Sequence, residues 1–121
     1  MAHGIGMWTQ RQQDGVTIVA QDAAARSEVL ERWQELDRLL ATPARVIIDL
    51  HGETLITSEA LAVLVAIVHR QRQSGGRLAL CRVHPGIANV LASMRLSRLI
   101  DVHVDVASAV AALRVSAAAP A

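Results

Sequence analysis

Apolar residues recur every three or four positions in two long stretches of this chain, a spacing that places them on one face of a helix. Residues 27–40 carry one such stripe, with charged residues, Arg32 among them, expected on the opposite face. Residues 58–73 carry a second stripe and end in basic residues before a Ser-Gly-Gly break. Cations favour the negative end of a helix and glycine commonly follows its last turn, so both stretches are predicted to be helical.

Short apolar runs before and between these helices predict strands. Residues 45–50 are apolar on both faces, as a strand is in the middle of a parallel sheet, and residues 77–83 form a second apolar run. Two more extended pieces open the chain, residues 6–12 and 16–20, and an Asp-Gly pair joins them. Both positions of Asp-Gly tolerate positive φ, so the sequence predicts a β-hairpin here.

The C-terminal part continues the alternation with two further helices around one strand. Pro85 lies near the first position of the third helix, residues 99–104 form the strand, and Asp105 caps the last helix. A hairpin followed by helices and strands in turn predicts an α/β domain with a mixed sheet that is parallel in the middle. We expect an ordered core over about residues 6–114 and a tail over residues 115–121.

Composition narrows the functional classes. A chain of 121 residues predicts a single domain, 1–121, long enough to bury a core. Phe and Tyr are absent and Trp occurs twice, so the core is aliphatic and no surface has the rings needed to stack on bases. With a formal net charge of +1, no general attraction to nucleic acid or to anionic lipid is expected.

Segments for export or for membrane insertion are not recognisable in the sequence. No stretch near the start combines a basic region, an apolar run and a small-residue cleavage site, and the most apolar run is about half the length of a bilayer span. Cys81 is the only cysteine, which excludes an intrachain disulfide and is typical of a reducing compartment. We therefore expect a cytoplasmic domain that does not insert into membranes.

Candidate catalytic groups are few. The five histidines contain no pair at the i, i+4 spacing of a helical zinc site, and no metal or cofactor is expected. Asp49 and His51 end a strand on the same side, which is compatible with a small polar site, but a solvated loop histidine is the favoured interpretation. Cys81 lies in an apolar strand, where a thiol behaves as a small hydrophobic group with a raised pKa.

Four arginines, Arg70, Arg72, Arg77 and Arg82, lie around the end of the second predicted helix. They are interpreted as a solvated helix end and strand edge, and not as a basic patch. No arrangement of base, nucleophile and orienting group is legible in the sequence, so an enzyme is not expected.

One segment is more specific. Residues 46–61 combine a hydrophobic strand that ends in Asp-Leu, a loop with one glycine, and Ile-Thr-Ser-Glu-Ala-Leu at the start of a helix. A Gly-Gly-Arg-Leu-Ala-Leu strand follows within residues 74–81, and two further stretches follow in order, at 90–100 and 105–113. This ordered set resembles the STAS domain family, the anti-sigma-factor antagonists and their relatives. The resemblance covers roughly residues 45–113.

The resemblance implies a SpoIIAA-like α/β fold, with a mixed four- to five-stranded sheet and helices mainly on one face. It also implies a non-enzymatic signalling module with Ser58 at the position of the regulatory serine. In such antagonists a partner kinase, itself an anti-sigma factor, phosphorylates this serine, and a phosphatase is a further partner. The unphosphorylated form binds the kinase and releases a sigma factor. The partner surface is expected to consist of Glu53, Thr54, Thr57, Ser58 and Glu59.

Two residues differ from the family pattern. Thr57 replaces an Asp before the serine, and Ala60 replaces a Gly that leaves room for a partner. Thr57 can still cap a helix but lacks the negative charge, and Glu59 would repel a phosphate on Ser58. Plain helix capping by Thr57 and Ser58 is therefore the alternative to regulated phosphorylation.

A second alternative keeps the fold and changes the role. STAS domains also serve as constitutive scaffolds, for example as accessory subunits bound to the ATPase of a lipid transporter. The chain is expected to be a monomer or a weak homodimer. Met7 and Trp8 lie on an N-terminal strand that could form an edge for pairing with another chain.

Overall fold

A computed structural model describes residues 7–22 and 28–118, the last four by their backbone alone. Five strands, four α-helices and one short 3-10 helix occur within these ranges. In chain order they are β1 (Trp8–Gln13), β2 (Val16–Gln21), α1 (Val29–Leu39), β3 (Arg45–Asp49), α2 (Ser58–Gln73), β4 (Arg77–Cys81), α3 (Pro85–Ser93), η1 (Leu96–Arg98), β5 (Asp101–His103) and α4 (Val106–Ala118). This is the hairpin followed by alternating helices and strands that the sequence predicts.

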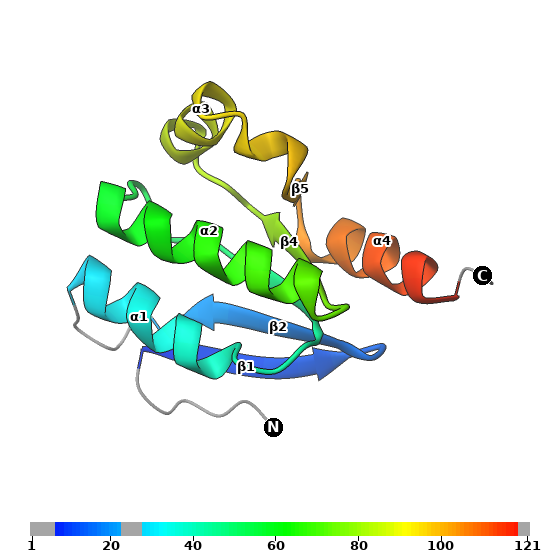
Figure 1. The fold of residues 1–121 in the computed structure, drawn as a ribbon. Helices are drawn as coiled ribbons and strands as arrows, with labels where there is room; N and C mark the ends of the chain where they lie inside the picture. The colour runs from blue at the N-terminus through cyan, green and yellow to red at the C-terminus, as the bar shows by residue number, and fades with distance from the viewer. Residues whose placement is uncertain (1–6, 23–27, 119–121) are drawn as a thin grey trace.

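The strands form one mixed sheet in the order β1-β2-β3-β4-β5 (Figure 1). β1 pairs antiparallel with β2, and the other neighbours are parallel. Asp14 and Gly15 join β1 to β2 with φ of 53° and 78°, so the expected turn forms because both residue types tolerate the left-handed region. Since β2 to β5 run in the same direction, their C-terminal ends share one edge of the sheet.

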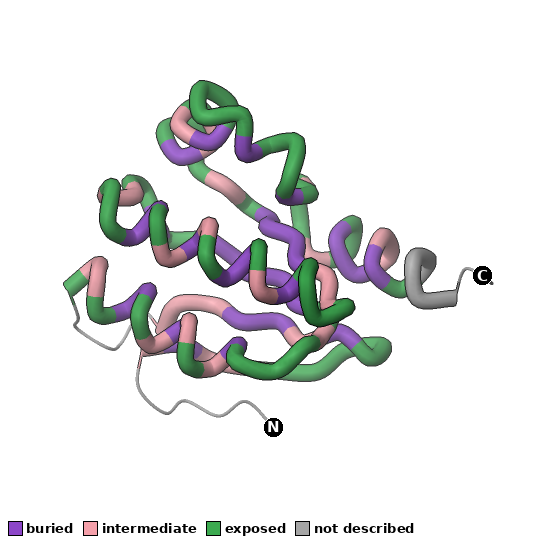
Figure 2. Tube along the Cα trace, in the orientation of Figure 1, coloured by how far each residue is buried: buried purple, intermediate pink, exposed green. Residues whose placement is uncertain are grey.

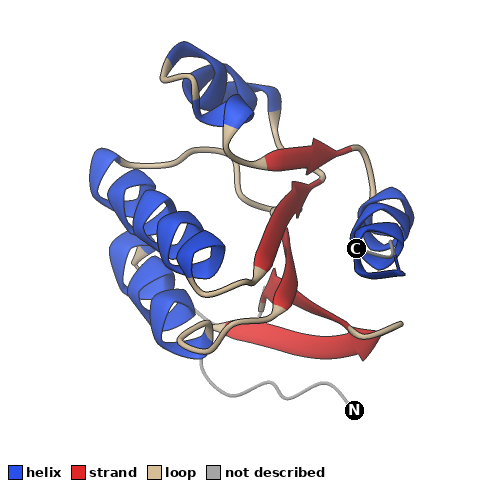
Figure 3. Ribbon diagram, turned by 45° about the vertical axis from the view of Figure 1, so that its right-hand side comes forward, coloured by secondary structure: helices blue, strands red, loops and turns tan. Residues whose placement is uncertain are grey.

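Helices cover the two faces of the sheet unequally. Figure 3 shows α1 and α2 side by side on one face and α4 on the other. One hydrophobic cluster joins α1, α2 and α3 to the sheet, and a smaller one lies under α4. Alternate residues of β3 point to opposite faces of the sheet, so Val46 and Ile48 pack in the first cluster and Ile47 packs in the second. Figure 2 shows buried segments through the central strands and along the inner sides of α1 and α2. The expectation of helices mainly on one face is confirmed.

The two tryptophans lie together in the larger cluster. Trp8 of β1 and Trp33 of α1 are both buried, with ring centroids 5.6 Å apart at an angle of 73°. The indole N–H of Trp8 donates to the backbone carbonyl of Arg32 at 2.6 Å. The side chain of Trp8 is therefore part of the core, and Met7 packs against the same cluster. β1 itself is an edge strand of the sheet, and its pairing with another chain stays a prediction.

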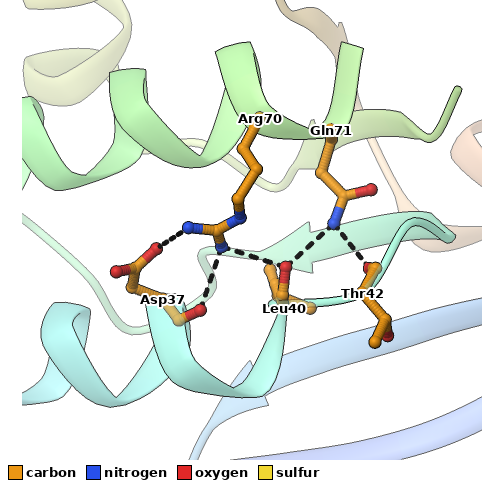
Figure 4. Close-up of polar contacts among 5 residues, drawn as sticks. All are labelled: Asp37, Leu40, Thr42, Arg70 and Gln71. Carbon is orange, nitrogen blue, oxygen red and sulfur yellow. Dashed lines mark hydrogen bonds and ion pairs between the residues drawn. The ribbon is translucent and has the colours of Figure 1, made fainter. Parts of the chain in front are cut away.

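Arg70 and Gln71 join the end of α2 to the end of α1 (Figure 4). The Arg70 guanidinium donates to a carboxylate oxygen of Asp37 at 2.6 Å and to the carbonyls of Asp37 and Leu40, each at 3.0 Å. The Gln71 amide donates to the carbonyls of Leu40 and Thr42 at 3.0 and 2.9 Å. Carbonyls in the last turn of a helix lack helical partners, and these bonds satisfy them. Arg70 is thus structural, which corrects its interpretation as a solvated cation.

Most elements end within one or two residues of the expected position, and the largest differences are at the C-terminal ends of β4 and α4. β4 ends at Cys81 because Arg82 adopts a φ of 53°, in the left-handed region, which turns the chain away from the sheet. α4 continues to Ala118 because its alanine-rich sequence favours a helix, so residues 115–118 are helical and not part of a tail. Within the described residues, no helix is both long and apolar enough to cross a membrane. Two expected element starts lie outside the described residues, Gly6 and Ser27.

Candidate functional site

Ser58 is the first residue of α2 and is exposed to solvent. Thr57 precedes it in an extended conformation, and its hydroxyl oxygen accepts a hydrogen bond from the Ala60 N–H at 3.1 Å. Thr57 is therefore the N-cap of α2, a position for which Thr is well suited. The Ser58 hydroxyl makes no hydrogen bond to any described residue, so capping does not occupy it.

The two residues after Ser58 point in different directions. Glu59 is exposed in the first turn of α2, where a carboxylate is favoured by the positive end of the helix dipole. Ala60 is fully buried in the larger hydrophobic cluster. The expectation was that its methyl group occupies space that a glycine would leave for a partner. The methyl group instead packs in the core, so this expectation is wrong.

Glu53, in the loop between β3 and α2, is inside the domain. Its side chain forms an ion pair with Arg32 of α1, in which one guanidinium nitrogen lies 2.9 and 3.0 Å from the two carboxylate oxygens. Glu53 is 4% exposed and Arg32 is 7% exposed. The Glu53 N–H also donates to the carbonyl of Leu50 at 3.0 Å. Glu53 was expected on the partner surface, but its carboxylate is unavailable there because Arg32 holds it in the interior.

The residues after Glu53 return to the surface. Thr54 is exposed, and Leu55 is 58% exposed, one of few large apolar side chains of the described chain that reach solvent to this extent. The carbonyl of Thr54 lies close to Gly86 at the start of α3, since a Cβ added there would lie 3.5 Å from it. Thr54, Leu55, Ser58 and Glu59, which we call the Ser58 surface, are thus the exposed part of the loop and of the first turn of α2.

Asp49 is the last residue of β3, and the loop between β3 and α2 begins after it. Its carboxylate accepts hydrogen bonds from two guanidinium nitrogens of Arg82, one at 3.0 Å, and from the backbone N–H of His51 at 3.0 Å. Burial by itself raises the pKa of Asp49, but the hydrogen bonds from Arg82 and His51 and the charge of Arg82 lower it below the usual value. Asp49 therefore binds an arginine, and the exposed imidazole of His51 makes no hydrogen bond to its carboxylate.

Cys81 lies between Asp49 and His103 in the register of three neighbouring strands. Burial and the nearby Asp49 carboxylate raise the pKa of Cys81 to about 12. The thiol is therefore protonated at neutral pH, and Cys81 is not an activated nucleophile. This confirms the expectation of a small buried hydrophobic group. In the described part of the chain, no three or more His, Cys, Asp or Glu residues are grouped so as to hold a metal ion.

The sequence pattern of one family, described as STAS domain, matches residues 8–109, from β1 into α4. The chain belongs to the STAS domain family. The resemblance is thereby confirmed from residue 45 to residue 109, and the match extends it to the N-terminal hairpin. The single five-stranded mixed sheet with four helices is the fold expected of a STAS domain.

Solved structures of STAS proteins share this fold. A Planctomyces limnophilus protein described as an anti-sigma-factor antagonist STAS domain protein is 24% identical, with a TM-score of 0.76 over 88% of this chain and 97% of its own. A Thermotoga maritima protein described as a candidate anti-sigma factor antagonist is 22% identical, with a TM-score of 0.76 over 89% and 95%. A variant of RsbS from Moorella thermoacetica is 18% identical, with a TM-score of 0.68 over 89% and 97%. No curated protein matches the chain at a significant level.

Two further arginines of this STAS domain, besides Arg70, lie elsewhere than the sequence predicts. Arg32 was expected in solvent, yet it lies three residues after Val29 and four before Leu36, at the border of the apolar stripe of α1. That spacing was the available signal. Arg82 was expected at a solvated strand edge, and no local pattern indicated its ion pair with Asp49, which lies 33 residues earlier.

Proposed function

We propose that this STAS domain is a non-enzymatic protein-binding module of the anti-sigma-factor antagonist type, switched by phosphorylation of Ser58. Its partner is a serine kinase that is also an anti-sigma factor, and a phosphatase resets the switch in the cytoplasm. One observation carries the proposal: Thr57 caps α2, while the hydroxyl of Ser58 is exposed and makes no hydrogen bond to a described residue. Capping therefore explains Thr57 and leaves the role of Ser58 open to modification.

Phosphate at Ser58 is physically compatible with the fold. It would lie beside the free N–H groups of the first turn of α2, at the positive end of the helix dipole. It also adds about −1.5 to −2 charges next to the carboxylate of Glu59. A partner shaped to the neutral hydroxyl and to the apolar side chain of Leu55 would then face a concentrated negative charge. The expected consequence is weaker partner binding by a domain that stays folded.

The Ser58 surface replaces the wider set of residues expected from the sequence. Thr54, Leu55, Ser58 and Glu59 are exposed and available to a partner. Thr57 is half-buried and its hydroxyl is engaged in the cap, so its contribution is to fix the first turn of α2. Glu53 acts from inside, because its ion pair with Arg32 holds the loop in place. We expect the domain to be a monomer or a weak homodimer, which light scattering after size exclusion will measure.

The kinase step is tested by incubating the chain with each candidate kinase anti-sigma factor and ATP, followed by mass spectrometry of the intact protein and its peptides. One phosphate on the peptide that contains Ser58 is expected, and none on the same peptide of Ser58→Ala. Absence of the modification with every cognate candidate, under conditions in which a known substrate is phosphorylated, would count decisively against the switch.

The binding step is tested with charge variants at the two ends of α2. Ser58→Asp is expected to weaken kinase binding about tenfold or more, and Ser58→Ala to bind like the unmodified protein. Ser74→Asp is the matched control, because it adds the same charge at the other, exposed end of α2. If Ser74→Asp weakens binding as much as Ser58→Asp, the effect is one of overall charge and not of the Ser58 surface.

A second candidate function is a scaffold that does not depend on phosphorylation, such as an accessory subunit of a transporter ATPase. The neutral Thr57, in place of the acidic residue of the family pattern, favours this alternative. A scaffold predicts that Ser58→Asp and Ser58→Ala bind the partner equally well. The same titration therefore separates the two functions.

A further inference from the structure

Charged residues also gather at the C-terminal end of α2, whose place beside β4 can be followed in Figure 1. A hollow of about 400 Å³ lies between the end of α2, the start of β4, η1 and the start of β5. Arg72, Arg77 and Arg98 line it, together with Asp101. Arg72 follows Ser58 by fourteen residues, or about 21 Å along the helix at about 1.5 Å per residue. The hollow is therefore separate from the Ser58 surface.

The hollow carries an excess of positive charge. Arg77 and Asp101 form an ion pair at 2.8 Å. Arg72 makes one long hydrogen bond, 3.4 Å, to the carbonyl of Leu99, and the guanidinium of Arg98 bonds to none of the described residues. Two guanidinium groups thus border one hollow, and no carboxylate of the described residues pairs with either of them.

A solvated helix end does not account for this arrangement. The last carbonyls of α2 already accept hydrogen bonds from the N–H groups of residues 74–76, so they do not require Arg72. Two arginines that are close to it in sequence have other partners, since Arg70 binds the end of α1 and Arg82 binds the end of β3. The fold instead brings Arg98 to the hollow from η1. Tertiary structure, and not the local run of arginines, assembles this site.

We infer that this hollow binds a small molecule that carries two negative charges on phosphate or carboxylate oxygens, either a phosphate monoester or a dicarboxylate. Guanidinium groups present parallel N–H donors that match two oxygens of such a group, which makes Arg the side chain suited to it. Leu78 and Leu99 supply an apolar wall for the uncharged part of the ligand. The volume lies within the range of about 300–1,000 Å³ that is usual for small-molecule sites. Asp101 pairs with Arg77 and so offsets its charge.

Isothermal titration of the full, unphosphorylated chain tests the inference. The probes are inorganic phosphate, glucose 6-phosphate and succinate, with glucose as the uncharged control. Binding of the anions and not of glucose is expected, and the ratio of glucose 6-phosphate to succinate affinity tells the phosphate source from the carboxylate source. No detectable binding of any of the three anions overturns the inference, whatever the outcome of the Ser58 experiments.

Charge variants locate the site. Arg72→Gln and Arg98→Gln are each expected to weaken anion binding about tenfold, because each removes a charged donor. Both side chains are exposed, so the fold is not at risk. Arg38→Gln is the matched control, an exposed arginine of α1 outside the hollow, and is expected to bind unchanged. Equal losses in all three variants would show general charge attraction and overturn the inference.

Asp101→Asn gives a test of opposite sign. It removes the only carboxylate that lines the hollow among the described residues, and is expected to tighten anion binding several-fold. Backbone amide shifts on ligand addition should be confined to residues 72–78 and 96–101. Unchanged or weaker binding by Asp101→Asn, or shifts centred on the start of α2, would contradict an anion held in this hollow.

Discussion

The two ends of α2 are attached to the domain by different interactions. Beside the N-terminal end, the ion pair of Arg32 and Glu53 is buried on both sides and holds the loop that leads to Ser58. At the C-terminal end, Arg70 and Gln71 donate to carbonyls of α1 and of the loop after it. The first attachment depends on one ion pair that is removed from water. The second depends on several hydrogen bonds, each of which contributes part of the stability. A single substitution should therefore disturb the Ser58 end more than the opposite end.

The largest effect is expected from Arg32→Met, which leaves the Glu53 carboxylate buried without its cation. Removing one partner of a buried ion pair typically lowers the free energy of unfolding by about 3–5 kcal/mol. Urea denaturation followed by circular dichroism measures the change. The double variant Arg32→Met/Glu53→Leu should regain most of the loss, because it removes the unpaired charge as well. A double variant as unstable as the single one would show that packing of Arg32, and not charge, dominates.

A smaller effect is expected at the other end from Gln71→Leu. The side chain is 1% exposed, and its replacement removes the donor to the Thr42 carbonyl and the acceptor for the Ala44 N–H, which lies 3.0 Å away. Unpaired buried polar groups lower the free energy of unfolding by about 2 kcal/mol here. The Leu40 carbonyl keeps its bond from Arg70, which limits the loss. Gln73→Leu, at an exposed position of the same helix, should change stability by less than about 0.5 kcal/mol.

The cap of α2 should contribute less than either attachment. Thr57→Ala removes the acceptor for the Ala60 N–H and is expected to lower the free energy of unfolding by about 1 kcal/mol. Thr57→Asp restores both the cap and the acidic residue of the family pattern, and is expected to be at least as stable as the unmodified protein. A loss in Thr57→Asp equal to that in Thr57→Ala would contradict the assignment of Thr57 as the N-cap.

The Asp49 carboxylate, at the C-terminal end of β3, should make the stability of the fold depend on pH. The pKa of Asp49 is lowered in the folded state, so its ion pair with Arg82 stabilises the fold at pH values above the unfolded pKa of about 3.9. This contribution is lost as the pH falls from about 4 through the lower folded pKa. Urea denaturation between pH 6 and pH 3, in steps of about half a unit, should show a shallower decline for Asp49→Asn. An identical decline would assign the acid sensitivity to other carboxylates.

The bounds of α2 were predictable because its signals are local. The apolar stripe, the threonine before the first turn and the glycines after the last one all lie within one stretch, and the helix spans Ser58–Gln73 as expected. The Asp-Gly turn and the capping carboxylate of Asp105, which accepts from the Ser108 N–H at 2.8 Å, were predictable for the same reason. The STAS family was predictable because the order of such local motifs is characteristic of it.

The misplaced residues share a different cause. Arg32, Arg70 and Arg82 have side chains whose position depends on partners from other elements. A charged residue is usually solvated, so the general tendency pointed to the surface for Arg32 and Glu53. Their burial became favourable only because the fold brings two opposite charges together from positions 21 residues apart.

The sequence by itself determined the order of the elements, the start and end of α2, and the place of Ser58 on its first turn, because these depend on spacing and capping over a few residues. Tertiary structure decided which of these side chains are buried with a partner and which are exposed to solvent. It turned Glu53 inward to Arg32, left Leu55 beside Ser58 in solvent, and brought Arg98 to the far end of α2. The physical reason is that a charge or an apolar group gains or loses its partner only through contacts between distant elements, which no local pattern records.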